Sequence, residues 1–204
     1  MPNEKKMQYT VLPPRMPPLS EDRMTDVQKK AVADMLAGPR GKVEGPYWAV
    51  MRSPGLMGVM QKAGEYFRFD CNLEKRLSEL AILMTARAWT QQFVWDWHAA
   101  VAVKAGMKET SVQAIGEGRR PHDLADDESV AYDFISETLA NKSVSDATYA
   151  RALKLLGETG VMDLLGVVGY YSMLSTVLNV ARVPLDEGRP LPLMPMPAQL
   201  GNKS

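Results

Sequence analysis

The sequence predicts an all-α protein of about eight helices. Apolar residues recur at helical spacing through the central part of the chain, and helix-start and helix-stop residues bracket these stripes. Strand signals are weak, because the longest β-like run, Tyr9 to Leu12, ends at a proline pair and no Asn-Gly or Asp-Gly turn is present. Proline-rich segments flank the helical part. We therefore expect an extended N-terminal arm over 1–20, one helical domain over 21–183 and a Pro-rich tail over 184–204, the arms being either disordered or laid over a neighbouring subunit.

The first expected helices have recognisable starts. Thr25 with Gln28 three residues later is a capping-box pattern, and the helix that follows stops at the Gly-Pro pair of 38–39. The Ser-Pro pair of 53–54 places proline at the first position of a second helix. Asn72 is a candidate cap for a third, in which apolar residues from 73 to 84 form one face.

The second half of the helical domain continues in the same way. A helix from about 92 to 105 ends at Gly106, a plausible left-handed cap. A short helix over 109–117 follows, and a longer one starts at the acidic run 126–128, whose charges suit the positive end of a helix. Ser145 caps a helix that reaches 156, and the last expected helix runs from about 161 to 180.

The composition narrows the function classes. Lys plus Arg and Asp plus Glu are 24 each, so no basic excess points to a nucleic acid or an anionic membrane surface. The single cysteine, Cys71, excludes an intrachain disulfide and a CxxC pair. Two histidines leave little room for a metal site, and we expect neither metal nor cofactor. No apolar run follows Met1 to Lys6, so we expect a cytoplasmic protein without a secretory signal.

One stretch approaches the length of a membrane span. Residues 164–181 carry no formal charge over 18 positions, which is near the lower limit for crossing a bilayer. The stretch also contains two glycines, two serines, a threonine and an asparagine. We therefore expect a core or subunit-interface helix rather than a membrane span.

The window 77–107 holds the residues best suited to chemistry, His98 and Glu79. Histidine transfers protons near neutral pH, and a nearby carboxylate can hold its tautomer. The two residues are 19 positions apart, which on one straight helix is about 28 Å of rise at 1.5 Å per residue. Contact requires a break, for which 89–91 is the candidate, with Thr90 as a possible cap. A tight reversal there predicts that Glu79 and His98 face each other across an antiparallel helix pair.

Simpler interpretations of the same residues stay open. Glu79 has Lys75 and Arg76 one turn before it and can pair with them. His98 can be a hydrogen-bonded core histidine. The aromatic residues around it form either core packing or a flat apolar wall for a ring-bearing ligand; they are Phe93, Trp95 and Trp97.

Arg40 is the charged residue of the turn Gly38-Pro39-Arg40-Gly41. A guanidinium in a turn can hold a ligand carboxylate through two parallel hydrogen bonds, or it can simply be exposed. The turn is no phosphate-binding loop, because the chain has neither a GxxxxGK[ST] nor a GxGxxG pattern.

The chain resembles the carboxymuconolactone decarboxylase family, which includes the alkylhydroperoxidase-D-like proteins. In the window the resemblance rests on Glu79-Leu80-Ala81-Ile82-Leu83, Arg87, Phe93-Val94-Trp95, His98 and Lys104-Ala105-Gly106-Met107. Outside it, the resemblance rests on the turn at Arg40, Ser53-Pro54, Gly169-Tyr170-Tyr171 and Leu178-Asn179. Together these residues span roughly 24–188.

The resemblance implies an alkylhydroperoxidase-D-like fold that assembles as a homotrimer or homohexamer. It implies a cofactor-free lyase, a decarboxylase, or an isomerase acting on a small carboxylated lactone or ring acid, as in the catabolism of aromatic compounds. His98 would be the general acid/base and Glu79 would orient it. Substrate contacts are expected from Arg40, Phe93, Trp95 and Tyr171.

The chain departs from the redox members of that family, which carry a CxxC motif just before the histidine. Here the two positions are Gln91 and Val94. Disulfide-based peroxide reduction needs a thiolate and a resolving thiol, so we expect no thiol peroxidase activity. Two further hypotheses are a non-catalytic oligomeric binding protein for a small hydrophobic ligand and a purely structural homo-oligomer without a pocket.

Overall fold

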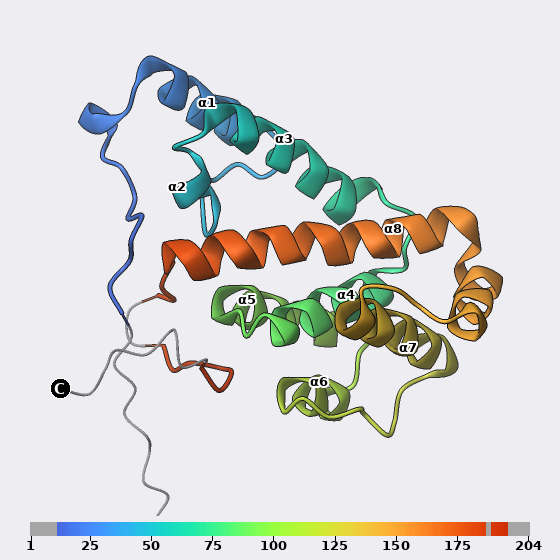
Figure 1. Cartoon of the computed structure of the whole chain (residues 1–204). Coiled ribbons are helices and arrows are strands. Elements are labelled where there is room, and N and C mark those ends of the chain that lie inside the picture. The colour runs from blue at the N-terminus through green and yellow to red at the C-terminus, as the bar shows by residue number, and fades with distance from the viewer. Residues whose placement is uncertain (1–11, 187–188, 196–204) are drawn as a thin grey trace, which may run out of the picture.

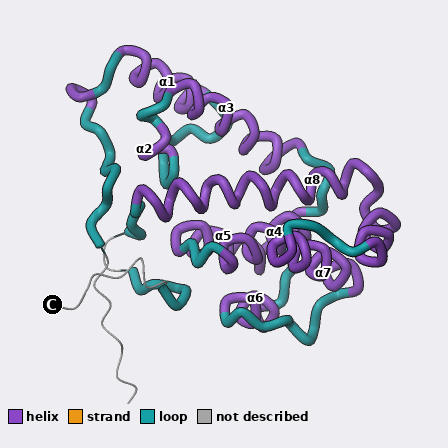
Figure 2. The backbone as a smooth tube through the Cα atoms, in the orientation of Figure 1, coloured by secondary structure: helices purple, strands orange, loops and turns teal. Residues whose placement is uncertain are grey.

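The computed structural model describes residues 12–186 and 189–195, and within them it contains helices and no strand (Figure 2). The all-α prediction is therefore confirmed. The α-helices are α1 (Asp26–Ala37), α2 (Tyr47–Val50), α3 (Pro54–Glu65), α4 (Lys75–Ala88), α5 (Gln92–Lys104), α6 (Glu109–Gly116), α7 (Asp126–Asn141) and α8 (Asp146–Ala181). A 3-10 turn, η1 (Glu21–Arg23), precedes α1, and a π-helical turn, η2 (Tyr66–Asp70), extends α3.

Helix α8 crosses the middle of the molecule, with α1 to α3 on one side and α4, α5 and α7 on the other (Figure 1). Helix α4 is the centre of the core, because it packs against α5, α6, α7 and α8. Every residue of α4 from Leu77 to Ala86 is buried, including the polar ones. A helix buried on all its faces places polar residues such as Glu79 inside the core, where each needs a partner.

Most of the predicted helix starts are confirmed. Thr25 and Gln28 form the expected capping box, in which the Gln28 amide N–H donates to Thr25 Oγ1 at 3.3 Å and the Thr25 N–H donates to Gln28 Oε1 at 2.9 Å. Pro54 is the first residue of α3. Ser145 caps α8, since its Oγ accepts from the Thr148 N–H at 3.3 Å.

The predicted cap at Asn72 is wrong. Helix α4 begins at Lys75, and the Asn72 backbone N–H instead donates to the Asp163 carboxylate at 3.2 Å. The same carboxylate accepts from the Tyr66 hydroxyl at 2.7 Å. Asp163 lies on α8, so a tertiary contact ties the segment between η2 and α4 to that helix, and Glu74 rather than Asn72 stands at the N-cap of α4.

The last two expected helices form one long element with a break. Gly157 has φ +68° and ψ 176° inside α8, which interrupts the helix between the two predicted segments. Helix α8 is the one helix among the described residues that is long and apolar enough to cross a membrane by length and composition. Its most apolar 18-residue window has a mean hydropathy of 1.5 and is 56% buried inside the protein.

The described parts of both proline-rich arms lie on their own chain. The Arg15 backbone N–H donates to the Ala181 carbonyl at 2.9 Å, at the end of α8. The Leu193 backbone makes two hydrogen bonds of 2.9 Å with the Gln92 side-chain amide, and the Leu193 side chain is buried. The proline pattern predicted extended chain but did not predict this docking; the rest of both arms lies outside the described residues.

Candidate functional site

The structure brings Glu79 and His98 together. Helices α4 and α5 reverse at 89–91, where Thr90 has φ +46°. The cap of α5 is Gln91 rather than Thr90, since the Gln91 Oε1 accepts from the Val94 N–H at 3.1 Å. Across the pair, His98 Nδ1 lies 2.7 Å from Glu79 Oε2, and both residues are buried. Sequence spacing had required this reversal for the two side chains to touch.

Glu79 also pairs with Lys75, so two interpretations of this carboxylate hold at once. Lys75 Nζ lies 2.7 Å from Glu79 Oε1, whereas Arg76 turns away to Asp127 and Glu128 of α7. Burial by itself raises the pKa of Glu79. The hydrogen bond and charge of His98, with those of Lys75, outweigh burial and lower the pKa below its ordinary value of 4.5. Glu79 is therefore a carboxylate at neutral pH.

The second ring nitrogen of His98 faces Tyr171 of α8. The Tyr171 hydroxyl lies 3.3 Å from His98 Nε2, and the two rings meet edge to face. Burial, followed by the charge of Glu79, raises the pKa of Tyr171 far above its usual value, so the hydroxyl keeps its proton. Because the Glu79 carboxylate can only accept a hydrogen bond, an imidazole in its neutral form carries its hydrogen on Nδ1. The lone pair of Nε2 then accepts a hydrogen bond from the Tyr171 hydroxyl.

His98 and Tyr171 line a cavity, here called the His98 cavity, which is partly open to solvent and offers about 50 Å³ to the centres of water-sized molecules. Its charged lining comes from two arginines and one glutamate, namely Arg40, Arg68 and Glu44. Its remaining walls are phenolic or apolar: Tyr47, Tyr170, Pro46, Phe93, Val94, Trp97 and Leu174. Positive charge thus exceeds negative charge in a largely aromatic pocket.

The loop between α1 and α2 closes one side of the His98 cavity. The Arg40 guanidinium lies over the Tyr47 ring, 5.1 Å from its centroid. The Tyr47 and Tyr170 hydroxyl oxygens are 3.0 Å apart, and Tyr170 donates to the Met60 carbonyl at 3.1 Å. A close approach at Gly64 of α3 makes this possible, because a Cβ there would overlap both the Tyr170 hydroxyl and the Arg40 guanidinium.

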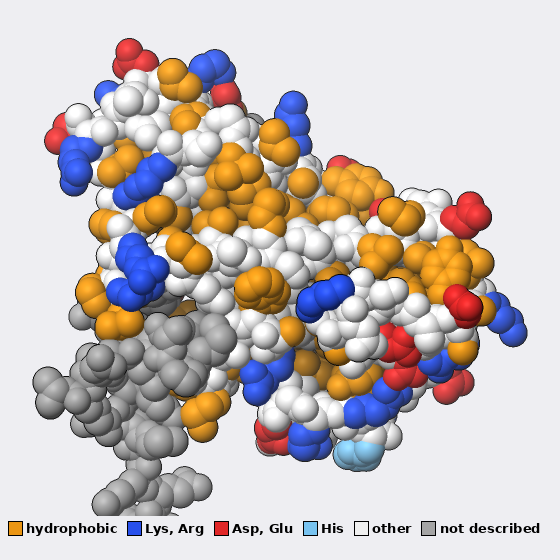
Figure 3. Space-filling view, in the orientation of Figure 1, with side chains coloured by type: hydrophobic (Ala, Val, Ile, Leu, Met, Phe, Trp, Pro, Cys, Tyr) orange, Lys and Arg blue, Asp and Glu red, His pale blue; other side chains and the backbone are white. Residues whose placement is uncertain are grey.

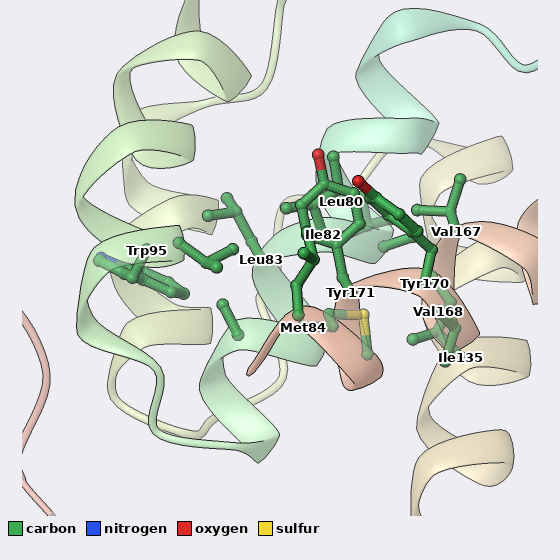
Figure 4. Packing of buried hydrophobic residues seen from close by; sticks show 14 of the residues in the cluster. Leu80, Ile82, Leu83, Met84, Trp95, Ile135, Val167, Val168, Tyr170 and Tyr171 are labelled. Carbon is green, nitrogen blue, oxygen red and sulfur yellow. The ribbon is translucent and has the colours of Figure 1, made fainter. Parts of the chain in front are cut away.

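Of the residues expected at the site, Trp95 lies elsewhere. Arg40, Phe93 and Tyr171 line the His98 cavity, as expected. The Trp95 ring instead packs against Gly116 of α6, and Trp95 and Tyr170 lie at opposite ends of the buried cluster in Figure 4. Successive residues of a helix point in different directions, so α5 can present only some of its aromatic side chains to one cavity. Trp97 takes the place expected of Trp95.

Sequence reasoning missed Arg68 and did not assign Tyr170 to the site. Arg68 reaches the His98 cavity from the π-helical turn η2. Neither a helical pattern of apolar residues nor a capping residue in the sequence predicts that turn. Tyr170 and Tyr171 of α8 both line the cavity, whereas Asn179 accepts from the Gln91 side chain at 3.0 Å.

Comparison with known protein families and with curated proteins found no relative of this chain. No family model and no curated protein matches the chain. Within residues 12–186 and 189–195, no three His, Cys, Asp or Glu side chains gather in a way that could hold a metal ion. Cys71 is half-buried, and its Sγ donates to the Phe67 carbonyl at 3.3 Å. The site therefore rests on the Glu79–His98 pair and the cavity beside it.

We predict that Glu79→Gln lowers the free energy of unfolding at neutral pH by about 3 kcal/mol, the usual cost of breaking a buried ion pair on one side. The pKa of Glu79 is lower in the folded protein than its ordinary value of 4.5. The stability that ionised Glu79 provides is therefore fully present above pH 4.5, and it is lost as the pH falls through the pKa of Glu79 in the folded protein. The difference between wild type and variant should shrink in acid. Urea unfolding of both proteins across this pH range measures it, and a difference that stays constant would contradict the prediction.

We predict that Gly64→Ala destabilises the protein by about 1–3 kcal/mol, because the added methyl group displaces Tyr170 and Arg40. Gly58→Ala is the matched control on the same helix, since a Cβ there meets no atom within 4 Å. The control should stabilise by about 0.5–1 kcal/mol through helix propensity. Thermal unfolding of both variants gives the comparison, and equal effects would show that the close approach at Gly64 is unimportant.

Proposed function

We propose that this protein is a cofactor-free lyase or isomerase that acts on a small carboxylated ring acid or lactone, with His98 as general acid/base. One observation carries the proposal: a buried imidazole is held at Nδ1 by the Glu79 carboxylate, and His98 lines a cavity that Arg40 and Arg68 also line. A carboxylate that fixes the tautomer of a histidine beside a cavity is a general arrangement for proton transfer. The resemblance to the carboxymuconolactone decarboxylase family agrees with this chemistry.

The Glu79–His98 pair can both take and give a proton. In an isomerisation, Nε2 removes a proton from one carbon and returns it to another. In a decarboxylation, the carbon–carbon bond to the carboxylate breaks, CO₂ leaves, and the electron pair left on carbon takes a proton from the Nε2–H of protonated His98. Glu79 stabilises the imidazolium in both cases, since its carboxylate accepts from Nδ1 at 2.7 Å.

The lining of the His98 cavity suits an anionic ring compound. The guanidinium groups of Arg40 and Arg68 can form paired hydrogen bonds with a carboxylate. Phe93 and Trp97 offer aromatic walls to a flat ring. Glu44 is held by Lys42, whose Nζ lies 2.7 Å from Glu44 Oε2, so the negative charge in the lining has a partner other than the two arginines.

Thiol peroxidase chemistry has no support in the same cavity. Val94 lines the cavity four residues before His98, and Gln91 is occupied as the cap of α5. Cys71, the one cysteine of the chain, is not among the residues that line the His98 cavity. A thiolate with a resolving partner is therefore missing from the site that we propose.

We predict that His98→Gln lowers kcat/KM at least about 10²-fold, the usual contribution of a general acid/base. A thermal-shift panel of small lactones, ring acids and keto acids first finds a ligand, since a compound at 100 times its Kd stabilises by about 2.7 kcal/mol. Turnover is then assayed with that compound. His122→Gln is the matched control, because the other histidine of the chain is exposed. Turnover that survives in His98→Gln would refute the role of His98.

A second candidate function is binding without catalysis. The observation that favours it is the Tyr171 hydroxyl, which already occupies the lone pair of His98 Nε2 at 3.3 Å. A binding protein would lose affinity only modestly in His98→Gln and would show no turnover with any compound of the panel. The same two variants thus separate the two candidates.

We also propose that the chain self-associates through α8. Met162, Met173 and Val180 are exposed on α8 at 64%, 38% and 53%. With Gly169 they recur at intervals of 7, 4 and 7 residues, which places them on one face of a helix. Hydrophobic side chains also gather over the region of α3 and α8 on the face shown in Figure 3. Contiguous exposed apolar surface of this kind is typical of protein interfaces.

We predict that Gly169→Arg shifts the sedimentation coefficient from an oligomer to a monomer. A Cβ at Gly169 meets no atom within 4 Å of its own chain, so the variant should fold. An arginine would nevertheless bring a charge into an apolar interface. Ala33→Arg on α1 is the control, since Ala33 is exposed on a helix outside the proposed interface. A wild-type monomer, or an oligomer that tolerates the Gly169 variant, would contradict this interface.

A further inference from the structure

Lys75 contacts the buried pair from the side opposite His98. Its Nζ lies 2.7 Å from Glu79 Oε1, while His98 Nδ1 lies 2.7 Å from the other carboxylate oxygen. The Glu79 side chain is fully buried, whereas the Lys75 side chain is 48% exposed. Each oxygen of one carboxylate thus has its own partner, one at the cavity and one at the protein surface.

Helix electrostatics do not explain why a lysine stands at this position. Lys75 is the first residue of α4, where the positive end of the helix dipole disfavours a cation. A lysine four residues before a glutamate is also the less favourable order for such a pair. The local helix would therefore gain little from Lys75. The role of Lys75 is instead explained by Glu79. A buried carboxylate with too few hydrogen-bonding or charged partners takes up a proton and becomes neutral.

The other charged and titratable groups around the pair act on its cavity side. Tyr171 approaches from α8, and Arg68 from η2. Arg40 and Glu44 approach from the loop before α2. Arg76 of α4 is held by Asp127 and Glu128 of α7, with Nη2 2.6 Å and Nη1 2.9 Å from their carboxylates. Among the described residues, Lys75 is thus the lysine or arginine that forms an ion pair with Glu79.

We propose that Lys75 is a positioning residue that keeps Glu79 ionised while His98 gains and loses its proton. When Nε2 takes a proton, the imidazolium can pass its Nδ1 proton to the carboxylate, which would discharge the ring. A cation beside Oε1 disfavours that transfer, so the charge stays on the imidazole that faces the cavity. This inference deepens the proposed function and rests on it for its catalytic consequence, whereas the charge state of Glu79 does not depend on any substrate.

The test is a titration of the ligand-free protein labelled with ¹³C at glutamate carboxyl groups and ¹⁵N at histidine. We expect Glu79 to titrate below its ordinary range in wild type, and Lys75→Met to shift this titration to higher pH. Lys75→Arg should restore it, because a guanidinium keeps the charge. Lys30→Met is the matched control, since Lys30 and Asp34 form an i, i+4 pair of 2.7 Å that is exposed on α1.

An unchanged Glu79 titration in Lys75→Met would overturn the inference. So would a wild-type Glu79 that titrates at or above its ordinary value, a result that needs no variant to fold. If the protein turns over a ring acid, kcat/KM can be measured against pH. In Lys75→Met, the fall of kcat/KM on the acidic side of this profile should move to higher pH, while KM at neutral pH stays unchanged. If the titration shifts but no compound is turned over, the role of Lys75 in fixing the charge of Glu79 stands and the proposed catalytic function falls.

Discussion

A carboxylate buried in the middle of the protein constrains the rest of the structure. Glu79 lies on α4, whose central residues are all buried, so its charge has to be balanced from within the fold. His98 of α5 and Lys75 of α4 provide that balance at 2.7 Å each. The reversal at Thr90 is required for this arrangement, because it brings residues that are 19 positions apart into contact.

The site lies where the buried core meets a cavity on one side and solvent on the other. On one side of Glu79, His98 opens into a cavity with arginine and aromatic walls; on the other, Lys75 reaches solvent. The walls come from elements far apart in the chain, and close packing at Gly64 lets Arg40 and Tyr170 enter the same space. Packing of α3 and α8 therefore decides the shape of the cavity, and the buried Glu79–His98 pair lies at its edge.

Helix α8 links the site to the outer surface of the protein. Tyr170 and Tyr171 on one face complete the cavity, whereas Met162 and Val180 on another face remain exposed. The same helix is fixed from outside by Arg15, whose backbone N–H closes its last turn, and from within by Asp163, which holds the segment before α4. An assembly built on the exposed face would thus be connected to the walls of the cavity through the part of α8 that follows the break at Gly157.

The sequence by itself determined the helical class, most helix boundaries and the residues of the central pair. Caps such as Thr25 act within one turn, and the distance between Glu79 and His98 along the chain already required a reversal. Tertiary structure decided the rest. Helix α4 begins at Lys75 rather than directly after Asn72, whose backbone binds Asp163. Trp95 packs against α6, and Arg68 reaches the cavity from a π-helical turn that the sequence does not indicate. Helical periodicity tells which residues share a face, but which neighbour covers that face depends on packing between elements distant in the chain.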